Sequence, residues 1–170
     1  MKSKKITTQM IVMLGLLTAM EIVLARFLSI ATWNLKIGFS FVPVAIAAIM
    51  YGPLAGGAVA ALGDFLGATL FPIGPYFPGF TLTAFLVGAV LGLFLHKKQT
   101  ALRILGAVVV NQLVLSLLLN TLWISILYSS PYGPLFLTRI GQCAVLAPIQ
   151  FVVIGIMTRV LGRYAKRVTA

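Results

Sequence analysis

Acidic residues, cysteine and histidine are nearly absent from this sequence of 170 residues. The two acids are Glu21 and Asp64, the single cysteine is Cys143 and the single histidine is His96. A lone cysteine cannot form an intrachain disulfide, and without further His or Cys ligands the chain cannot build a zinc or iron site. We therefore expect no disulfide, no metal site and no cofactor.

The sequence also lacks the short motifs that mark ATP hydrolysis and several classes of catalysis. It has no G-x-x-x-x-G-K-[ST] loop, no G-x-S-x-G, no H-E-x-x-H and no pair of carboxylates beside a histidine. It has no obvious internal repeat, from which many transporters build their site, and no basic stripe on a polar domain that would favour nucleic acid. We expect neither an enzyme nor a self-sufficient transporter, and ATP hydrolysis would belong to partner subunits.

Apolar residues dominate what is present. The chain is 61% hydrophobic and 9% charged, and its mean hydropathy is +1.09. A soluble domain is usually about 45–50% apolar and about 25% charged, so the expected solvent is a lipid bilayer. Because a spanning helix needs roughly 20 apolar residues, the length allows a single transmembrane domain over residues 1–170 and leaves no room for a soluble one.

The apolar runs predict an all-α, six-helix membrane bundle. Breaks at Gly52-Pro53, in the proline-rich segment 71–78, at 96–100 and at 129–134 separate the runs. The predicted helices cover residues 6–30, 37–51, 54–70, 79–95, 101–128 and 135–161. The first run is too long for a signal peptide core and is interrupted by Glu21 and Arg26, so we expect it to remain as a helix.

Cations predict the orientation of the bundle. With six spans, one side of the membrane carries most of the 13 Lys and Arg residues, namely Lys2, Lys4, Lys5, Lys97, Lys98, Arg103, Arg159, Arg163, Lys166 and Arg167. The positive-inside rule places that side, with both termini, in the cytoplasm. Arg26, Lys36 and Arg139 remain on the outer half. Each either reaches the membrane interface or joins the others in a site for an anionic ligand from outside.

Polar side chains inside the predicted spans are the other candidates. Asp64 needs a partner in lipid, which is either Arg26 or Arg139 in a salt bridge or the N–H groups of a ligand. We expect Glu21 to have a structural partner. Amides in the last two helices either join helices by hydrogen bonds or contact a ligand; they are Asn111, Gln112, Asn120, Gln142 and Gln150.

Aromatic residues near the outer side suggest a wall for a flat ring. Asn120 and Trp123 are three residues apart and share a helix face. With Tyr76, Phe77 and Phe80 they would enclose a ring system. The alternative for Trp123 is the aromatic belt that Trp and Tyr form at membrane interfaces.

Several segments resemble the S components of energy-coupling factor (ECF) transporters, and the folate-specific members best. The similar segments are RFLSI (26–30), KIGFSFVP (36–43), YGPLAGG (51–57), GD (63–64) and FPIGPYFPGFTL (71–82). The resemblance covers about residues 10–95 with specific motifs and rests beyond them on hydropathy and length.

This resemblance implies a fold, partners and a mechanism. It implies a six-helix S component in a bacterial cell membrane, in complex with a transmembrane scaffold subunit and two ATPases. Such proteins capture a vitamin at the outer face and deliver it by toppling in the membrane, while loops, here 31–36 and 71–78, gate the pocket. Family members often dock through Ala-x-x-x-Ala in the first helix. The nearest match here is Gly15-x-x-x-Ala19, whereas Ala19-x-x-x-Val23 departs from the pattern.

Folate also fits the candidate residues by its chemistry. The two carboxylates of the glutamate tail would be held by Arg26, Lys36 or Arg139. Aromatic side chains would enclose the rings. Hydrogen bonds from the pterin N–H groups would be accepted by Asp64 or Asn111. Other readings stay open: an S component for riboflavin or thiamine, a non-binding accessory subunit, or a small membrane enzyme that uses Asp64 or Glu21. The outward cations disfavour cationic thiamine.

Overall fold

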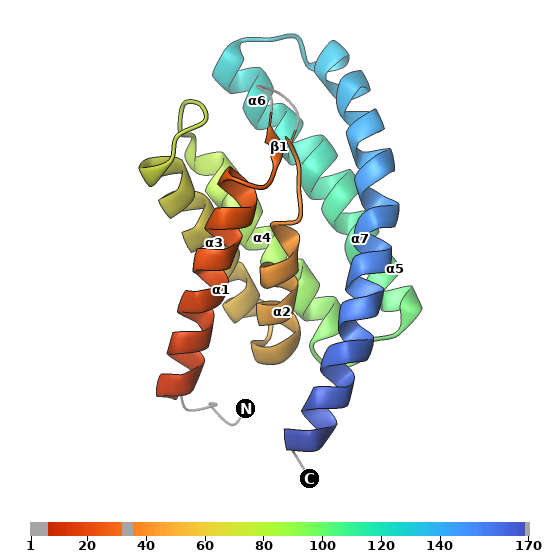
Figure 1. The fold of residues 1–170 in the computed structure, drawn as a ribbon. Helices are drawn as coiled ribbons and strands as arrows, with labels where there is room; N and C mark the ends of the chain where they lie inside the picture. The colour runs from red at the N-terminus through yellow and green to blue at the C-terminus, as the bar shows by residue number, and fades with distance from the viewer. Residues whose placement is uncertain (1–6, 32–35, 169–170) are drawn as a thin grey trace.

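The protein is a bundle of helices with one short β-ladder (Figure 1). The computed structural model describes residues 7–31 and 36–168. Its elements are α1 (Thr8–Arg26), β1 (Ile30–Ala31), β2 (Lys36–Ile37), α2 (Phe41–Tyr51), α3 (Pro53–Leu70), α4 (Pro78–Leu95), α5 (Ala101–Val109), η1 (Val110–Leu119), α6 (Asn120–Tyr128) and α7 (Tyr132–Val168). Since α5, η1 and α6 follow one another without a break, the predicted all-α bundle of six helical rods is confirmed.

Four predicted helix ends differ from the structure by three residues or more. The first helix ends at Arg26 and the second begins at Phe41, because the residues between them include an antiparallel pairing of Ile30 with Ile37. The last helix begins at Tyr132, ahead of the predicted residue 135, because a proline in the first helical turn costs no intrahelical hydrogen bond. It continues to Val168, beyond the predicted end at residue 161.

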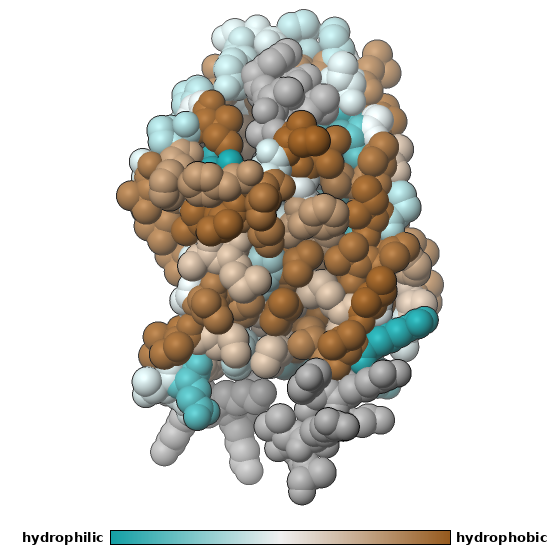
Figure 2. Space-filling model, viewed as in Figure 1, coloured by the Kyte–Doolittle hydropathy of each residue, from teal (hydrophilic) through white to brown (hydrophobic). Residues whose placement is uncertain are grey.

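Five helical segments are long and apolar enough to cross a membrane, counted over the described residues. They are Thr8–Arg26, Pro53–Leu70, Pro78–Leu95, Ala101–Tyr128 and Tyr132–Leu161. Figure 2 shows a broad apolar surface over the middle of the face in view. Helix α2 has 11 residues, which at about 1.5 Å per residue reach about half of the roughly 30 Å hydrocarbon core.

The short α2 divides the bundle into two ends. It ends at Gly52, whose φ of 99° favours glycine, and Pro53 starts α3 at once. In Figure 1, α2 lies towards the end where α1 begins and α7 finishes, and the β-ladder lies at the opposite end. We call the end with the β-ladder the strand end. Because α2 is short, no helix continues its path through the strand end of the bundle.

Close glycine contacts pack the α2 end of the bundle. A Cβ on Gly88 would collide with the backbone of Gly56, and one on Gly92 would collide with Pro53. Helices α3 and α4 therefore touch at backbone distance, as small residues allow in lipid. The buried core beside them includes Ala48 and Leu91. This end is a packed scaffold, and the room for a site lies at the other end.

Candidate functional site

A cavity of about 600 Å³ opens at the strand end of the bundle. Its volume lies within the range of about 300–1,000 Å³ that small-molecule sites occupy. Phe41 and Val44, in the first turn of α2, contribute to its lining. The cavity thus occupies the position that a full-length second helix would have filled.

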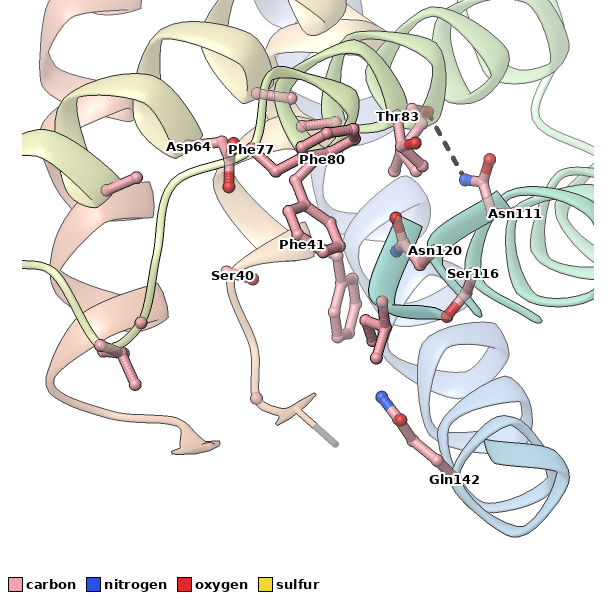
Figure 3. A pocket seen from close by; sticks show the side chains of 18 of the residues that line it. Ser40, Phe41, Asp64, Phe77, Phe80, Thr83, Asn111, Ser116, Asn120 and Gln142 are labelled. Atoms are coloured by element: carbon pink, nitrogen blue, oxygen red, sulfur yellow. Dashed lines mark hydrogen bonds between the residues drawn. The ribbon is translucent and has the colours of Figure 1, made fainter. Parts of the chain in front are cut away.

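Most of the predicted site residues line this cavity. Arg26, Asp64, Tyr76, Phe77, Phe80, Asn111, Asn120 and Arg139 all do so. Figure 3 shows Asp64, Phe77 and Phe80 on one side of the pocket and Asn111, Asn120 and Ser116 on the other. We call the lining from α1, α3, the loop 71–77 and α4 the N-terminal wall, and the lining from η1, α6 and α7 the C-terminal wall.

Two glycines of α3 make room for charged side chains on the N-terminal wall. A Cβ on Gly63 would collide with the carboxylate of Glu21, and a Cβ on Gly67 would lie 2.8 Å from Arg26 Nε. These glycines are one helical turn apart, so one stripe of α3 accepts both side chains from α1. Arg26 Nε is buried and has no hydrogen-bond partner within the described residues. The guanidinium therefore keeps donor capacity at the cavity.

Asp64 belongs to a hydrogen-bonded chain on the same wall. Its Oδ2 accepts a hydrogen bond from Thr81 Oγ1 at 2.8 Å, and Thr81 Oγ1 lies 3.1 Å from the Tyr76 hydroxyl. Within the described part of the chain, no ion pair joins this carboxylate to Arg26 or Arg139. Among the described residues, Asp64 therefore has Thr81 as its partner and not a cation, and its remaining lone pairs are available to a ligand N–H.

Aromatic rings cover the loop side of the cavity. Phe77 and Phe80 meet edge to face with centroids 6.1 Å apart, and both line the cavity. Trp123 does not line it. Its ring lies 5.6 Å from the Phe77 ring, and its indole Nε1 donates to Thr83 Oγ1 at 3.0 Å. Trp123 thus lies behind the wall that Phe77 and Thr83 form.

Unusual helix winding builds the C-terminal wall. Residues of η1 are π-helical, so that the Asn120 N–H bonds to Leu115 O, five residues back. Asn111 and Asn120 are nine residues apart, which is about two and a half turns of an α-helix and would put them on opposite faces. A π-helix takes roughly four and a half residues per turn, so nine residues make about two turns. Both asparagines therefore face the cavity.

Amide oxygens of this wall have unused acceptor capacity. Asn111 Nδ2 donates weakly to Val87 O at 3.5 Å. Asn111 Oδ1, Gln112 Oε1 and Asn120 Oδ1 are buried and accept no hydrogen bond in the described part of the chain. A buried acceptor without a donor costs roughly 1–3 kcal/mol, so three such oxygens around one cavity favour a ligand that carries N–H donors.

Arg139 crosses between the helices of this wall. Its Nη2 donates to Ser116 O in η1 at 3.1 Å, and the residue is 5% exposed. Beside it, the Cys143 thiol donates to Gln112 O at 3.4 Å. Arg139 therefore both lines the cavity and ties α7 to η1. The sequence had suggested a cation that binds a ligand, pairs with Asp64 or reaches the interface, and not this link between helices.

Two predictions about the loop 31–36 lie largely outside the described residues. The backbone of Lys36 belongs to β2, but its side chain is not among the described ones, and residues 32–35 of the first predicted gate are not described. The second predicted gate contributes Ile73, Gly74 and Pro75 to the lining, together with Tyr76 and Phe77.

Sequence reasoning missed part of the lining. Ser40, Phe41, Thr83, Ser116 and Tyr128 were not selected, although they line the cavity. The cavity lining also includes four polar residues that had been noted inside the spans but not selected for the folate site, namely Glu21, Gln112, Gln142 and Gln150. A usable signal was present: polar residues recur every four or five positions from 111 to 120, which fits π-helical winding better than an α-helix.

The predicted docking residues lie on the outer surface of α1. Gly15 and Ala19 are exposed, and no atom lies within 4 Å of a Cβ built on Gly15. The buried residues of this helix, including Leu17, Thr18 and Glu21, face the bundle instead. Because both small residues are exposed, a partner helix has access to this surface.

Comparisons with known proteins agree on the family. A family model described as the S component of the ECF-type riboflavin transporter matches residues 5–167. The folate transporter FolT of Clostridium novyi is 43% identical over 142 residues, which are 83% of this chain and 83% of that protein. FolT of Leuconostoc mesenteroides is 34% identical over 153 residues, which are 86% of this chain and 82% of that protein.

Solved structures resemble the fold as well. A crystal structure of FolT bound with folic acid matches with a TM-score of 0.86 at 33% identity, and covers 90% of this chain and 94% of that one. The S component of a bacterial ECF transporter matches with a TM-score of 0.54 at 23% identity over 95% and 97% of the two chains, which is a likeness of fold alone.

These relatives are transport proteins and not enzymes, and they come from bacteria. Together with the five apolar helices, they identify a multi-pass protein of a bacterial membrane. The resemblance inferred from residues 26–82 is thereby confirmed. The chain belongs to the S components of ECF-type transporters.

Proposed function

We propose that this chain is the folate-binding subunit of an ECF-type importer. The observation that carries the proposal is the single cavity that brings together Arg26, Asp64, an aromatic wall and buried amide acceptors. The strong likeness to a structure of FolT bound with folic acid supports the same ligand. Capture is expected at the strand end of the bundle, where the cavity opens.

The two ends of folate match different parts of the cavity. The glutamate tail has two carboxylates, and Arg26 offers a fork of N–H donors whose Nε has no hydrogen-bond partner among the described residues. Lys36 and Arg139 would add positive charge near the tail. The pterin ring carries N–H donors for Asp64 and for the oxygen of Asn111 or Asn120, and Phe77 and Phe80 would cover its faces.

Folate binding to the purified chain tests this proposal. Calorimetry in detergent, together with quenching of Trp33 and Trp123 fluorescence, is expected to give saturable binding near one folate per chain. Reduced folates should compete, and riboflavin and thiamine should not. A well-folded protein that binds no folate would exclude this function.

Riboflavin is the alternative ligand, because the matching family model describes a riboflavin transporter subunit. Riboflavin is also flat and carries ring N–H and C=O groups, but it has no carboxylate. An uncharged ligand gives Arg26 no anion to bind. Binding of riboflavin that Arg26→Ala leaves unchanged would support this alternative over folate.

The importer context completes the proposal. A transmembrane scaffold subunit would dock on the exposed surface of α1 at Gly15 and Ala19, two ATPase subunits would supply energy, and toppling would carry the ligand inward. Both termini would face the cytoplasm, in keeping with the cations near them. Replacing both Gly15 and Ala19 with Leu should abolish uptake by the assembled complex while folate binding by the lone chain persists. Unchanged uptake would rule out docking through this surface.

A further inference from the structure

Trp123 contacts the cavity only through other residues. Its indole Nε1 donates to Thr83 Oγ1 at 3.0 Å, and its ring packs on Phe77 with an interplanar angle of 44°. Phe77 and Thr83 both line the cavity, and Trp123 does not. Since Trp123 belongs to α6, while Phe77 precedes α4 and Thr83 lies within it, the contact joins the two walls from outside the cavity.

The hydrogen-bond donor of the Thr83 side chain is already used. Besides accepting from Trp123, the Thr83 hydroxyl donates to Gly79 O at 3.0 Å, and the residue is 2% exposed. A hydroxyl has one donor hydrogen, so Thr83 has none left for a ligand. Its hydroxyl therefore holds the start of α4 in place and does not recognise a ligand by donation.

Gly79 allows the rings to meet. A Cβ on Gly79 would lie 2.6 Å from Phe77 Cε1 and 2.7 Å from Trp123 Cδ2. Any side chain here would push the two rings apart. Phe77 in turn holds Phe80 by an edge-to-face contact, so the aromatic wall depends on a ring that is itself held by Trp123.

We propose that Trp123 is a positioning residue that holds the loop 71–77 closed over the cavity through Phe77 and Thr83. This inference rests on the proposed function for its ligand but not for its geometry. If the contact keeps the loop closed, losing it should speed both ligand escape and entry of solvent, while the residues that touch the ligand stay unchanged.

A double-mutant cycle measures the contact. W123F keeps a ring on Phe77 but removes the N–H donor, and T83V removes the acceptor at nearly constant volume. Each single variant is expected to raise the dissociation rate of tritiated folate, chased with unlabelled folate, about tenfold. The double variant W123F/T83V should be no faster than either one, because both remove the same bond. T83S, which keeps the hydroxyl, should restore the rate of the unmodified protein.

Thr121 supplies a matched control. It lies on the same helix, α6, is fully buried, and its Oγ1 has no hydrogen-bond partner within the described residues. T121V makes the same chemical change without touching Phe77 or the cavity. It should leave the dissociation rate unchanged. An equal acceleration in T121V, or effects of W123F and T83V that multiply in the double variant, would overturn the inference.

A measurement without ligand separates this inference from the proposed function. In a C143A background, Ser116→Cys places a thiol at the cavity, where a small water-soluble thiol reagent reports how often the cavity opens. W123F, T83V and the double variant should raise the labelling rate equally, by several-fold. If the unmodified protein binds no folate while this pattern holds, the folate assignment fails and the positioning role stands. Equal labelling of all variants would refute the positioning role even where folate binds.

Discussion

Three glycines where α3 packs on α4 lie against neighbouring backbone, whereas the described glycines of the last helix face open space. Gly56, Gly88 and Gly92 leave no room for a Cβ, whereas Gly141 and Gly155 of α7 have no atom within 4 Å of one. The first half is thus a fixed scaffold that carries the N-terminal wall. The second half is held less closely, and its contribution to the cavity depends on polar side chains and on helix winding.

The largest expected effect tests this difference in packing. Gly88→Ala would drive a Cβ into the backbone of Gly56, which cannot rotate away as a side chain could. We expect the free energy of unfolding to fall by about 3 kcal/mol or more, measured as thermal denaturation in detergent. Gly155→Ala, the matched control in α7, should change it by less than about 0.5 kcal/mol. An equal loss of unfolding free energy in both variants would show that the two halves do not differ in how closely they are packed.

The next largest effect is expected from removing the positive charge of Arg26 on the N-terminal wall. Arg26→Ala should weaken folate binding about 100-fold, since charge-assisted hydrogen bonds to a carboxylate are each worth roughly 1.5–3 kcal/mol. Arg26→Lys should recover only part of this, because an ammonium lacks the fork geometry. Arg103→Ala is the control, as its Nη1 donates to Phe94 O and it does not line the cavity. Unchanged affinity in Arg26→Ala would remove this residue from the site.

Amides of the C-terminal wall should act on the other end of the ligand. Asn111→Ala and Asn120→Ala are each expected to weaken folate binding about tenfold, which corresponds to about 1.4 kcal/mol for one hydrogen bond. Binding of a pterin that lacks the glutamate tail distinguishes the contributions of the two walls. Both Asn variants should weaken its binding, whereas Arg26→Ala should not. If Arg26→Ala alone weakened binding of this fragment, the orientation would be reversed.

The same contrast explains what could be predicted from the sequence. The helix count and Arg26, Asp64, Phe77 and Phe80 followed from hydropathy, breaks and motifs, because these features are local in the chain. The loss of the first turn from the second helix was missed, although Gly38 is a poor helix former and Ser40 is a typical residue before a helix. Pairing of Ile37 with Ile30 accompanies this loss.

The winding of the C-terminal wall was not predicted, although its residues Asn111, Asn120 and Arg139 were predicted site residues and line the cavity. The turn that brings Asn111 and Asn120 to one face is π-helical, and no proline or glycine in that segment announces it. Trp123 shared a predicted face with Asn120, but the structure puts a layer of Phe77 and Thr83 between it and the cavity. Helix register thus limits prediction on the C-terminal wall, and motif similarity helps on the N-terminal one.

The smallest expected effect concerns the support of Asp64 on the N-terminal wall. Thr81 donates to Asp64 at 2.8 Å and links it to Tyr76, so Thr81→Val should keep the Asp64 side chain at the cavity but hold it less firmly. A hydrogen bond of this kind contributes about 0.5–1.5 kcal/mol, and affinity for folate should fall about threefold to tenfold. Thr81→Ser keeps the donor and should bind as tightly as the unmodified protein. The contrary result would be an unchanged affinity for folate in Thr81→Val together with a loss of binding in Asp64→Asn. The carboxylate would then need no support from Thr81, and the packing of α3 on α4 would be enough to orient it.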